Sequence, residues 1–246
     1  NVWVFFGTGR FWTVADKAEC LAECEPPNEG SAPCLACQTQ SRRWFFGVKE
    51  PRTASGPHAG ELNYSEVSKS DLLDTSGYEI YEGGYVDTNG DGTVDMEYPE
   101  LLAEISDHDG WYFQFEQNGE RSLYQPVVLG GIVTFTSYIP STDICEFEGQ
   151  SNLYAMYYLG GTAYSESVIG TGGGSIEVPA LGGGTETKQK IKKSISLGTG
   201  VGTAPTFHIG SESKVMIQSS TGAILSVTET TANQVKSGLK AWKEEF

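Results

Sequence analysis

Residues 132–137 have the sequence IVTFTS, a segment that is apolar and β-branched and alternates apolar with hydroxyl residues in its second half. β-Branched and aromatic residues are favoured in strands, and alternation indicates a strand with one face turned towards a core. The segment PVVLGG at 126–131 precedes it and ends in a glycine turn, and LYAMY at 153–157 follows as a further apolar run. Together they predict three strands joined by turns.

The same order of segments recurs near the end of the chain. PTFHIG at 205–210 corresponds to 126–131, KVMIQSS at 214–220 to 132–137, and AILSV at 223–227 to 153–157. A repeated small sheet that cannot bury its faces alone favours radial stacking, as in a β-propeller. We therefore expect an all-β fold, a modified or partial β-propeller with long insertions. An irregular β-sandwich is the alternative, because the two copies are degenerate.

Further segments extend the predicted sheets. VWVFF at 2–6 and RWFFGV at 43–48 predict a strand and its returning partner, and GWYFQF at 110–115 predicts another strand. A glycine-rich stretch at 163–188 predicts flexible loops around a short edge strand at 175–178. Helix is scarce, with short candidates at 71–74 and 98–105.

Length and charge limit the classes of function. A chain of 246 residues with a net charge of −16 fits a single all-β unit, 1–246, whose surface attracts cations. Such a surface repels nucleic acid and anionic lipid headgroups, so we expect neither as a partner. No apolar run approaches the ~18 residues of a membrane span. The chain starts inside a predicted strand, so we expect it to be part of something longer, with an N-terminal segment or companion chain missing.

Four cysteines lie together within an insertion at 17–40, and Cys145 lies apart from them. Two disulfides that staple this insertion are the favoured interpretation for an oxidising compartment, and three pairings are possible. A zinc site is the rival, because Cys34 and Cys37 have the spacing of one half of such a site. The four disulfide candidates are Cys20, Cys24, Cys34 and Cys37.

The clearest chemistry lies at residues 87–95, DTNGDGTVD, which match the D-x-[DN]-x-[DN]-G spacing of a calcium loop. Alternate oxygen donors can converge on one hard cation while the glycine at 92 permits a sharp turn. Side-chain ligands would be Asp87, Asn89 and Asp91, Thr93 would ligate through its carbonyl, and Asp95 would ligate directly or through water.

The loop departs from an EF-hand. Tyr98 occupies the position of the bidentate glutamate, although Glu97 and Glu100 are close by, and residues 85–86 before the loop look extended. We therefore expect a Ca²⁺ loop outside an EF-hand, with an affinity in the extracellular range of ~10⁻⁴ to 10⁻³ M. An acidic solvated turn is the alternative.

The sequence shows no catalytic constellation. His58, His108 and His208 are isolated from nucleophiles, and neither a serine elbow nor a zinc-protease helix occurs. His208 lies in a predicted strand and His108 in a predicted solvated turn, which favours structural roles. We expect a protein that is not an enzyme.

Several motifs resemble those of PilY-type proteins of type IV pilus biogenesis. The most specific are GWY at 110–112, GER at 119–121 and the stretch at 126–143, PVVLGGIVTFTSYIPSTD, with Cys145. Others are VFFGTGRF at 4–11, QTQS at 38–41, FGV at 46–48, QSSTG at 218–222, KSG at 236–238 and AWKE at 241–244. The resemblance spans the chain in order, except for the insertions.

This resemblance implies the C-terminal propeller of a pilus-tip protein that supports pilus biogenesis, docks on minor pilins and opposes retraction. The implied location is the cell surface, in the fimbrium, reached through the periplasm, and the implied cofactor is Ca²⁺ at 87–95. Some members of the family mediate cell adhesion. The remaining alternatives are a free calcium-dependent lectin or adhesin and a quinoprotein-like propeller enzyme.

Overall fold

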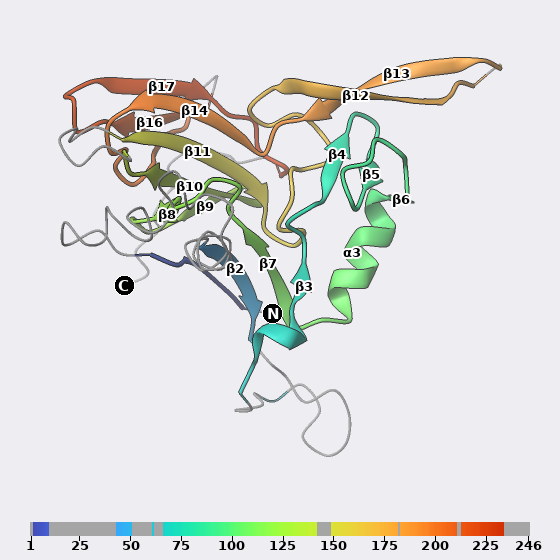
Figure 1. The fold of residues 1–246 in the computed structure, drawn as a ribbon, viewed down its shortest axis with the longest axis horizontal. Coiled ribbons are helices and arrows are strands. Elements are labelled where there is room, and N and C mark those ends of the chain that lie inside the picture. The colour runs from blue at the N-terminus through green and yellow to red at the C-terminus, as the bar shows by residue number, and fades with distance from the viewer. Residues whose placement is uncertain are drawn as a thin grey trace, which may run out of the picture.

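The computed structural model describes residues 2–9, 43–50, 61, 66–141, 149–181, 183–210 and 213–233. Within these ranges the protein is all-β and is built from several sheets, none of which closes on itself (Figure 1). The insertion at 17–40, its four cysteines, Cys145 and His58 lie outside the described residues. The disulfide and zinc hypotheses therefore stay predictions.

The first sheet is formed largely by aromatic segments. Its order is β1 (Trp3–Gly7), β2 (Trp44–Lys49), β7 (Gly110–Gln114) and β3 (Leu73–Asp74). β1 and β2 pair antiparallel, with Phe6 opposite Phe46, which confirms that 43–48 is the returning strand. β3 pairs parallel with β7.

The second sheet contains the segment that decides the fold class. β10 (Ile132–Ile139) pairs antiparallel with β9 (Val127–Leu129), β11 (Gln150–Tyr157) and β8 (Arg121–Ser122), and β14 (Ser194–Thr199) adds to the outer side of β11. The three strands predicted at 126–157 are therefore confirmed as neighbours.

The predicted repeat of this unit forms a separate sheet of the same local topology. β15 (Thr206–His208) pairs antiparallel with β16 (Lys214–Gln218), which pairs antiparallel with β17 (Ile224–Thr228). β9-β10-β11 and β15-β16-β17 are thus two antiparallel meanders of the same order. The radial arrangement of a propeller does not follow from this, and the stacked open sheets fit a sandwich-like fold.

The remaining sheet carries the acidic loop. Its order is β12 (Thr171–Pro179), β13 (Thr185–Ile191), β4 (Glu79–Tyr81), β5 (Tyr85–Asp87) and β6 (Met96–Glu97). Figure 1 shows the β12–β13 hairpin extending away from the stacked sheets, and helix α3 (Tyr98–Ser106) next to β5 and β6.

Two local predictions differ from the structure. The strand expected at 175–178 is longer in the structure, where β12 also includes Gly172, Gly173 and Gly174 at positive φ. The pairing of β12 with β13 shifts register at these glycines. Much of the expected loop is therefore hairpin. The helix expected at 71–74 is wrong. Only a 3-10 turn, Lys69–Asp71, forms there, because Leu73 and Asp74 pair with β7 as a strand.

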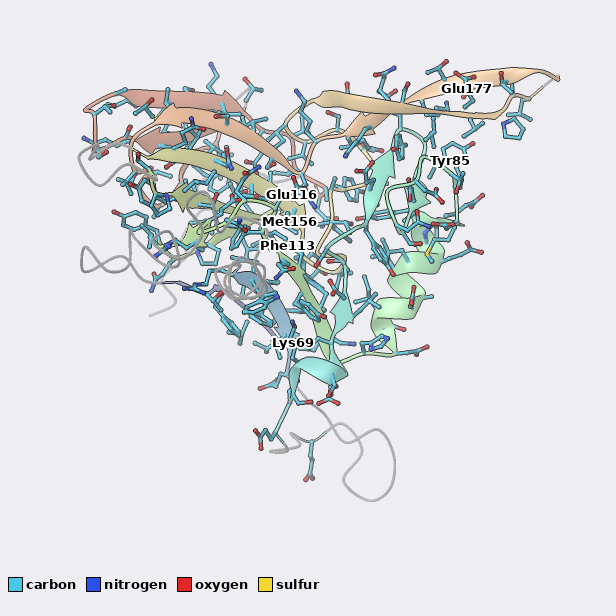
Figure 2. All side chains as sticks on the ribbon, viewed as in Figure 1. Lys69, Tyr85, Phe113, Glu116, Met156 and Glu177 are labelled. Carbon is cyan, nitrogen blue, oxygen red and sulfur yellow. The ribbon has the colours of Figure 1, made fainter. Side chains whose placement is uncertain are left out.

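The main core lies between the first and second sheets. Phe45 and Phe135 stack with centroids 3.8 Å apart, and Phe135 stacks in turn on Tyr154 at 5.0 Å. Phe113 and Met156 lie in the same cluster (Figure 2). The opposite face of the second sheet packs on the β15-β16-β17 sheet, where Leu153, Val215 and Ile217 form a second apolar cluster. Their partly buried neighbours are Ile195, Leu197, Phe207 and Val227.

The second sheet is therefore the middle of three layers, and its hydroxyl residues are buried as well. Thr134 Oγ1 donates to Glu229 Oε1 at 2.8 Å, and Thr136 Oγ1 donates to the carbonyl of Thr203 at 3.1 Å. Within the described ranges, no helix is long and apolar enough to cross a membrane.

Glu229 supplies a prediction about pH. Its side chain is 1% exposed, and Oε2 has no hydrogen-bond partner in the described part of the chain. Burial raises the pKa of Glu229 from 4.5 to about 7, because the charged form loses its hydration. The folded state therefore holds this proton to higher pH than the unfolded state does.

The contribution of Glu229 to the free energy of unfolding is most favourable below about pH 4.5. It falls between pH 4.5 and 7 and stays low above pH 7. Glu229→Gln should remove this loss, which is of order 3 kcal/mol, so the variant should gain stability over the parent as pH rises. Urea unfolding from pH 4.5 to 8 measures it, with the exposed Glu177→Gln as control. Parallel pH profiles for parent and Glu229→Gln would contradict the assignment.

Candidate calcium loop

The loop at 87–95 connects two paired strands. β5 runs into it and β6 leaves it, with Val86 opposite Met96, and the amide of Asp95 donates to the carbonyl of Val86 at 2.9 Å. The extended segment predicted before the loop is confirmed. Helix α3 begins at Tyr98, directly after β6, so a helix follows the strand pair that carries the loop.

The acidic residues near the twelfth position have another role in this structure. The amide of Glu97 donates to Glu100 Oε2 at 2.9 Å, and both residues take part in a capping box at the start of α3. A carboxylate at a helix N-terminus satisfies free amides and interacts favourably with the helix dipole. Glu100 therefore fixes the end of the loop through the helix.

Asp87 is the residue around which the loop folds. It ends β5 and is 0% exposed. Its Oδ1 accepts from the amides of Asn89 at 3.0 Å and Gly90 at 2.6 Å, and its Oδ2 accepts from the amide of Gly92 at 2.7 Å. Burying a carboxylate is costly unless such donors surround it, so these three amides are what make the position tenable.

The next predicted ligands lie on the exposed turn of the loop. Asn89 Oδ1 accepts from the amide of Asp91 at 2.9 Å, and Asp91 Oδ1 accepts from the hydroxyl of Thr93 at 2.6 Å and its amide at 2.9 Å. The hydrogen bonds from Thr93 lower the pKa of Asp91. Gly90 and Gly92 have φ of 74° and 85°, a conformation in which glycine is favoured.

Asp95 contacts the loop from its other end. Its Oδ2 accepts from the amide of Thr88 at 2.8 Å and from the Thr88 hydroxyl at 2.6 Å. The structure thus brings all five predicted ligands into one hydrogen-bonded loop. Among the described residues, however, no three His, Cys, Asp or Glu side chains form a group that could hold a metal ion.

The donor set nevertheless suits a hard cation. Asp87, Asn89, Asp91 and Asp95 supply side-chain oxygens and Thr93 supplies a carbonyl oxygen, which is the chemistry that calcium prefers. The hydroxyls of Thr93 and Thr88 engage one oxygen of each exposed carboxylate, Asp91 Oδ1 and Asp95 Oδ2. Asp87 already lies on the rigid end of a strand.

Sequence reasoning missed the charged neighbours of the loop. Glu79 in β4 lies opposite Asp87 in β5, and its Oε1 forms an ion pair with the ammonium of Lys190. Glu79 Oε2 accepts from the hydroxyl of Tyr81 at 2.9 Å. Burial and this hydrogen bond raise the pKa of Tyr81 to about 12. No spacing in the sequence joins residues so far apart.

Two histidines can also be placed. His208 lies in β15, as predicted, with an exposed side chain. His108 follows α3 in a turn, and its amide donates to the carbonyl of Ile105 at 3.1 Å.

Asp87 should support the loop even without a metal. Asp87→Ala removes the acceptor of three amides and should cost about 2–3 kcal/mol of unfolding free energy in the presence of a chelator. Asp91→Ala should cost much less under the same conditions, because Asp91 is exposed. Denaturant unfolding in excess chelator measures both. Equal losses for the two variants would contradict the central role of Asp87.

The site has to be interpreted from its own geometry. Comparison with models of protein families, with curated proteins and with solved structures found no match to this chain. The resemblance to PilY-type proteins accordingly rests on the motifs quoted above.

Proposed function

We propose that this protein is a non-enzymatic, calcium-binding structural and interaction module. The observation that carries the proposal is the loop at 87–95, which places an all-oxygen donor set between β5 and β6 around the buried carboxylate of Asp87. Three carboxylates in so short a segment repel one another, and a divalent cation offsets that repulsion.

Calcium would act on the architecture around the loop. Asp87 and Asp95 lie at its two ends, next to β5 and β6, so an ion held by both would tie the hairpin to the start of α3. Because the ion binds this arrangement and not the unfolded chain, binding adds to the stability of the fold by linkage. It also reduces the negative charge of a strongly acidic chain.

The PilY-type resemblance supports a place for the module in a type IV pilus. On this proposal it docks on minor pilins or other tip proteins at the cell surface, supports pilus biogenesis and opposes retraction. The three stacked sheets, antiparallel except for the β3–β7 pair, are compatible with neighbouring blades of a modified propeller, the arrangement that the resemblance implies.

Calcium should raise the melting temperature of the parent by several degrees at ~10 mM, as expected for a dissociation constant in the extracellular range, and a chelator should reverse the rise. Asp91→Asn should lose most of it. Glu166→Gln removes the same charge from another exposed site and should keep it. Calorimetric titration of the three proteins provides the affinities. Identical heats for parent and Asp91→Asn would dispose of the site.

The pilus assignment needs a separate test. Tagged protein should co-purify minor pilins from sheared surface pili of a piliated bacterium in calcium, and much less of them after chelation. Mass spectrometry of the captured proteins is the measurement, with the Asp91→Asn variant as matched bait. Capture that excludes pilins, while calcium still stabilises the parent, would refute the pilus role and leave the metal site standing.

A further inference from the structure

A cavity of about 210 Å³ lies beside the acidic loop. Its walls come from the β3–β4 turn with β4, the tip of the loop, the end of β13 with the turn that follows, and single residues after β7 and β11. The lining residues that carry its chemistry are Ser76, Glu79, Gly90, Glu116, Lys190 and Lys193.

Lys193 is the unusual member of this set. Its side chain is 19% exposed, and its ammonium lies 3.8 Å from Glu116 Oε1 and 5.6 Å from the centroid of the Phe113 ring. Within the part of the chain that is described, Nζ makes no hydrogen bond. An ammonium has three donors, and in Lys193 none of them is hydrogen-bonded to a described residue.

The two acidic residues that line the cavity, Glu79 and Glu116, do not provide a hydrogen-bond acceptor for Lys193. Glu79 is already engaged by Lys190 and by the hydroxyl of Tyr81. Glu116 also lines the cavity but is 71% exposed, and an ion pair at 3.8 Å with so solvated a carboxylate contributes little. Burial lowers the pKa of Lys193; the charge of Glu116 opposes this effect, and the charge of Lys190 adds to it.

We propose that this cavity binds the carboxylate of a ligand, with the ammonium of Lys193 as its main partner. A carboxylate would supply the acceptor that Lys193 lacks through a short, charge-assisted hydrogen bond. The size of the cavity suits a small organic acid or one acidic side chain of a peptide. A dianion such as phosphate fits less well, because Glu79 and Glu116 border the same space.

The cavity shares a wall with the acidic loop, since Asn89 and Gly90 line it. A calcium ion held there would offset negative charge next to the carboxylate, so each ligand should strengthen binding of the other by the same factor. This coupling, unlike the cavity itself, rests on the proposed calcium site.

The test uses propionate and its neutral isostere propionamide, and a blocked tripeptide with a central glutamate against its glutamine counterpart. Chemical-shift titration of the full chain at constant ionic strength measures binding. Propionate and the glutamate peptide should each bind more tightly than their neutral partners. Lys193→Met should weaken the charged probes at least about tenfold. Lys192→Met removes the same charge from the adjacent residue, which does not line the cavity, and should bind as the parent does.

The two probes distinguish the source of the carboxylate. Tighter binding of the glutamate peptide supports a protein partner, and tighter binding of propionate supports a free acid. Equal binding of charged and neutral probes, or equal loss in Lys193→Met and Lys192→Met, would overturn the proposal. Repeating the carboxylate titration on Asp91→Asn in calcium separates the two sites. If this variant still binds the carboxylate but calcium no longer strengthens that binding, only the metal site has been lost.

Discussion

The middle sheet, which packs on both of its faces, is the constraint on which the rest of this structure depends. Phe135 and Tyr154 fill the side towards the first sheet, and Leu153 fills the side towards β15-β16-β17. A sheet that is covered on both faces needs an apolar surface packed against each face. Every polar group that it buries also needs a hydrogen-bond partner. The aromatic strands β2 and β7 and the C-terminal meander meet the first need.

The sequence predicts much of this at the level of strands. The β-branched run at 132–137, its returning partners and the second copy at 205–227 are all strands with the expected neighbours. The burial of the hydroxyl face was not predictable, because alternation normally indicates a solvated side. Thr134 is buried by Glu229, which lies 95 positions further on, and such a contact leaves no local pattern. The glycines of β12 misled for a similar reason, since pairing with β13 overrides their low intrinsic preference for strands.

The candidate site, too, was predictable only in its local features. The spacing of oxygen-bearing residues predicted the loop and its candidate ligands, because such loops are local. It gave no indication that Asp87 would be fully buried while Asp91 and Asp95 lie in solvent. Nor did it join Glu79, Lys190 and Lys193 to this region. An acidic chain therefore carries, next to its densest group of carboxylates, one lysine that is neutralised by an ion pair and one that is poorly satisfied.

The attachment of β13 to β4 bears on the order in which the chain can mature. The two strands share the registered pair Lys190 and Tyr81, and the ion pair to Glu79 spans 111 positions. During synthesis from the N-terminus, the acidic hairpin therefore emerges long before the lysine that balances Glu79. Contacts of such long sequence separation form slowly, because a large loop must close first. Until then the nascent hairpin carries its carboxylates without that counter-charge, so its final local geometry is a late event in the biosynthesis of this protein.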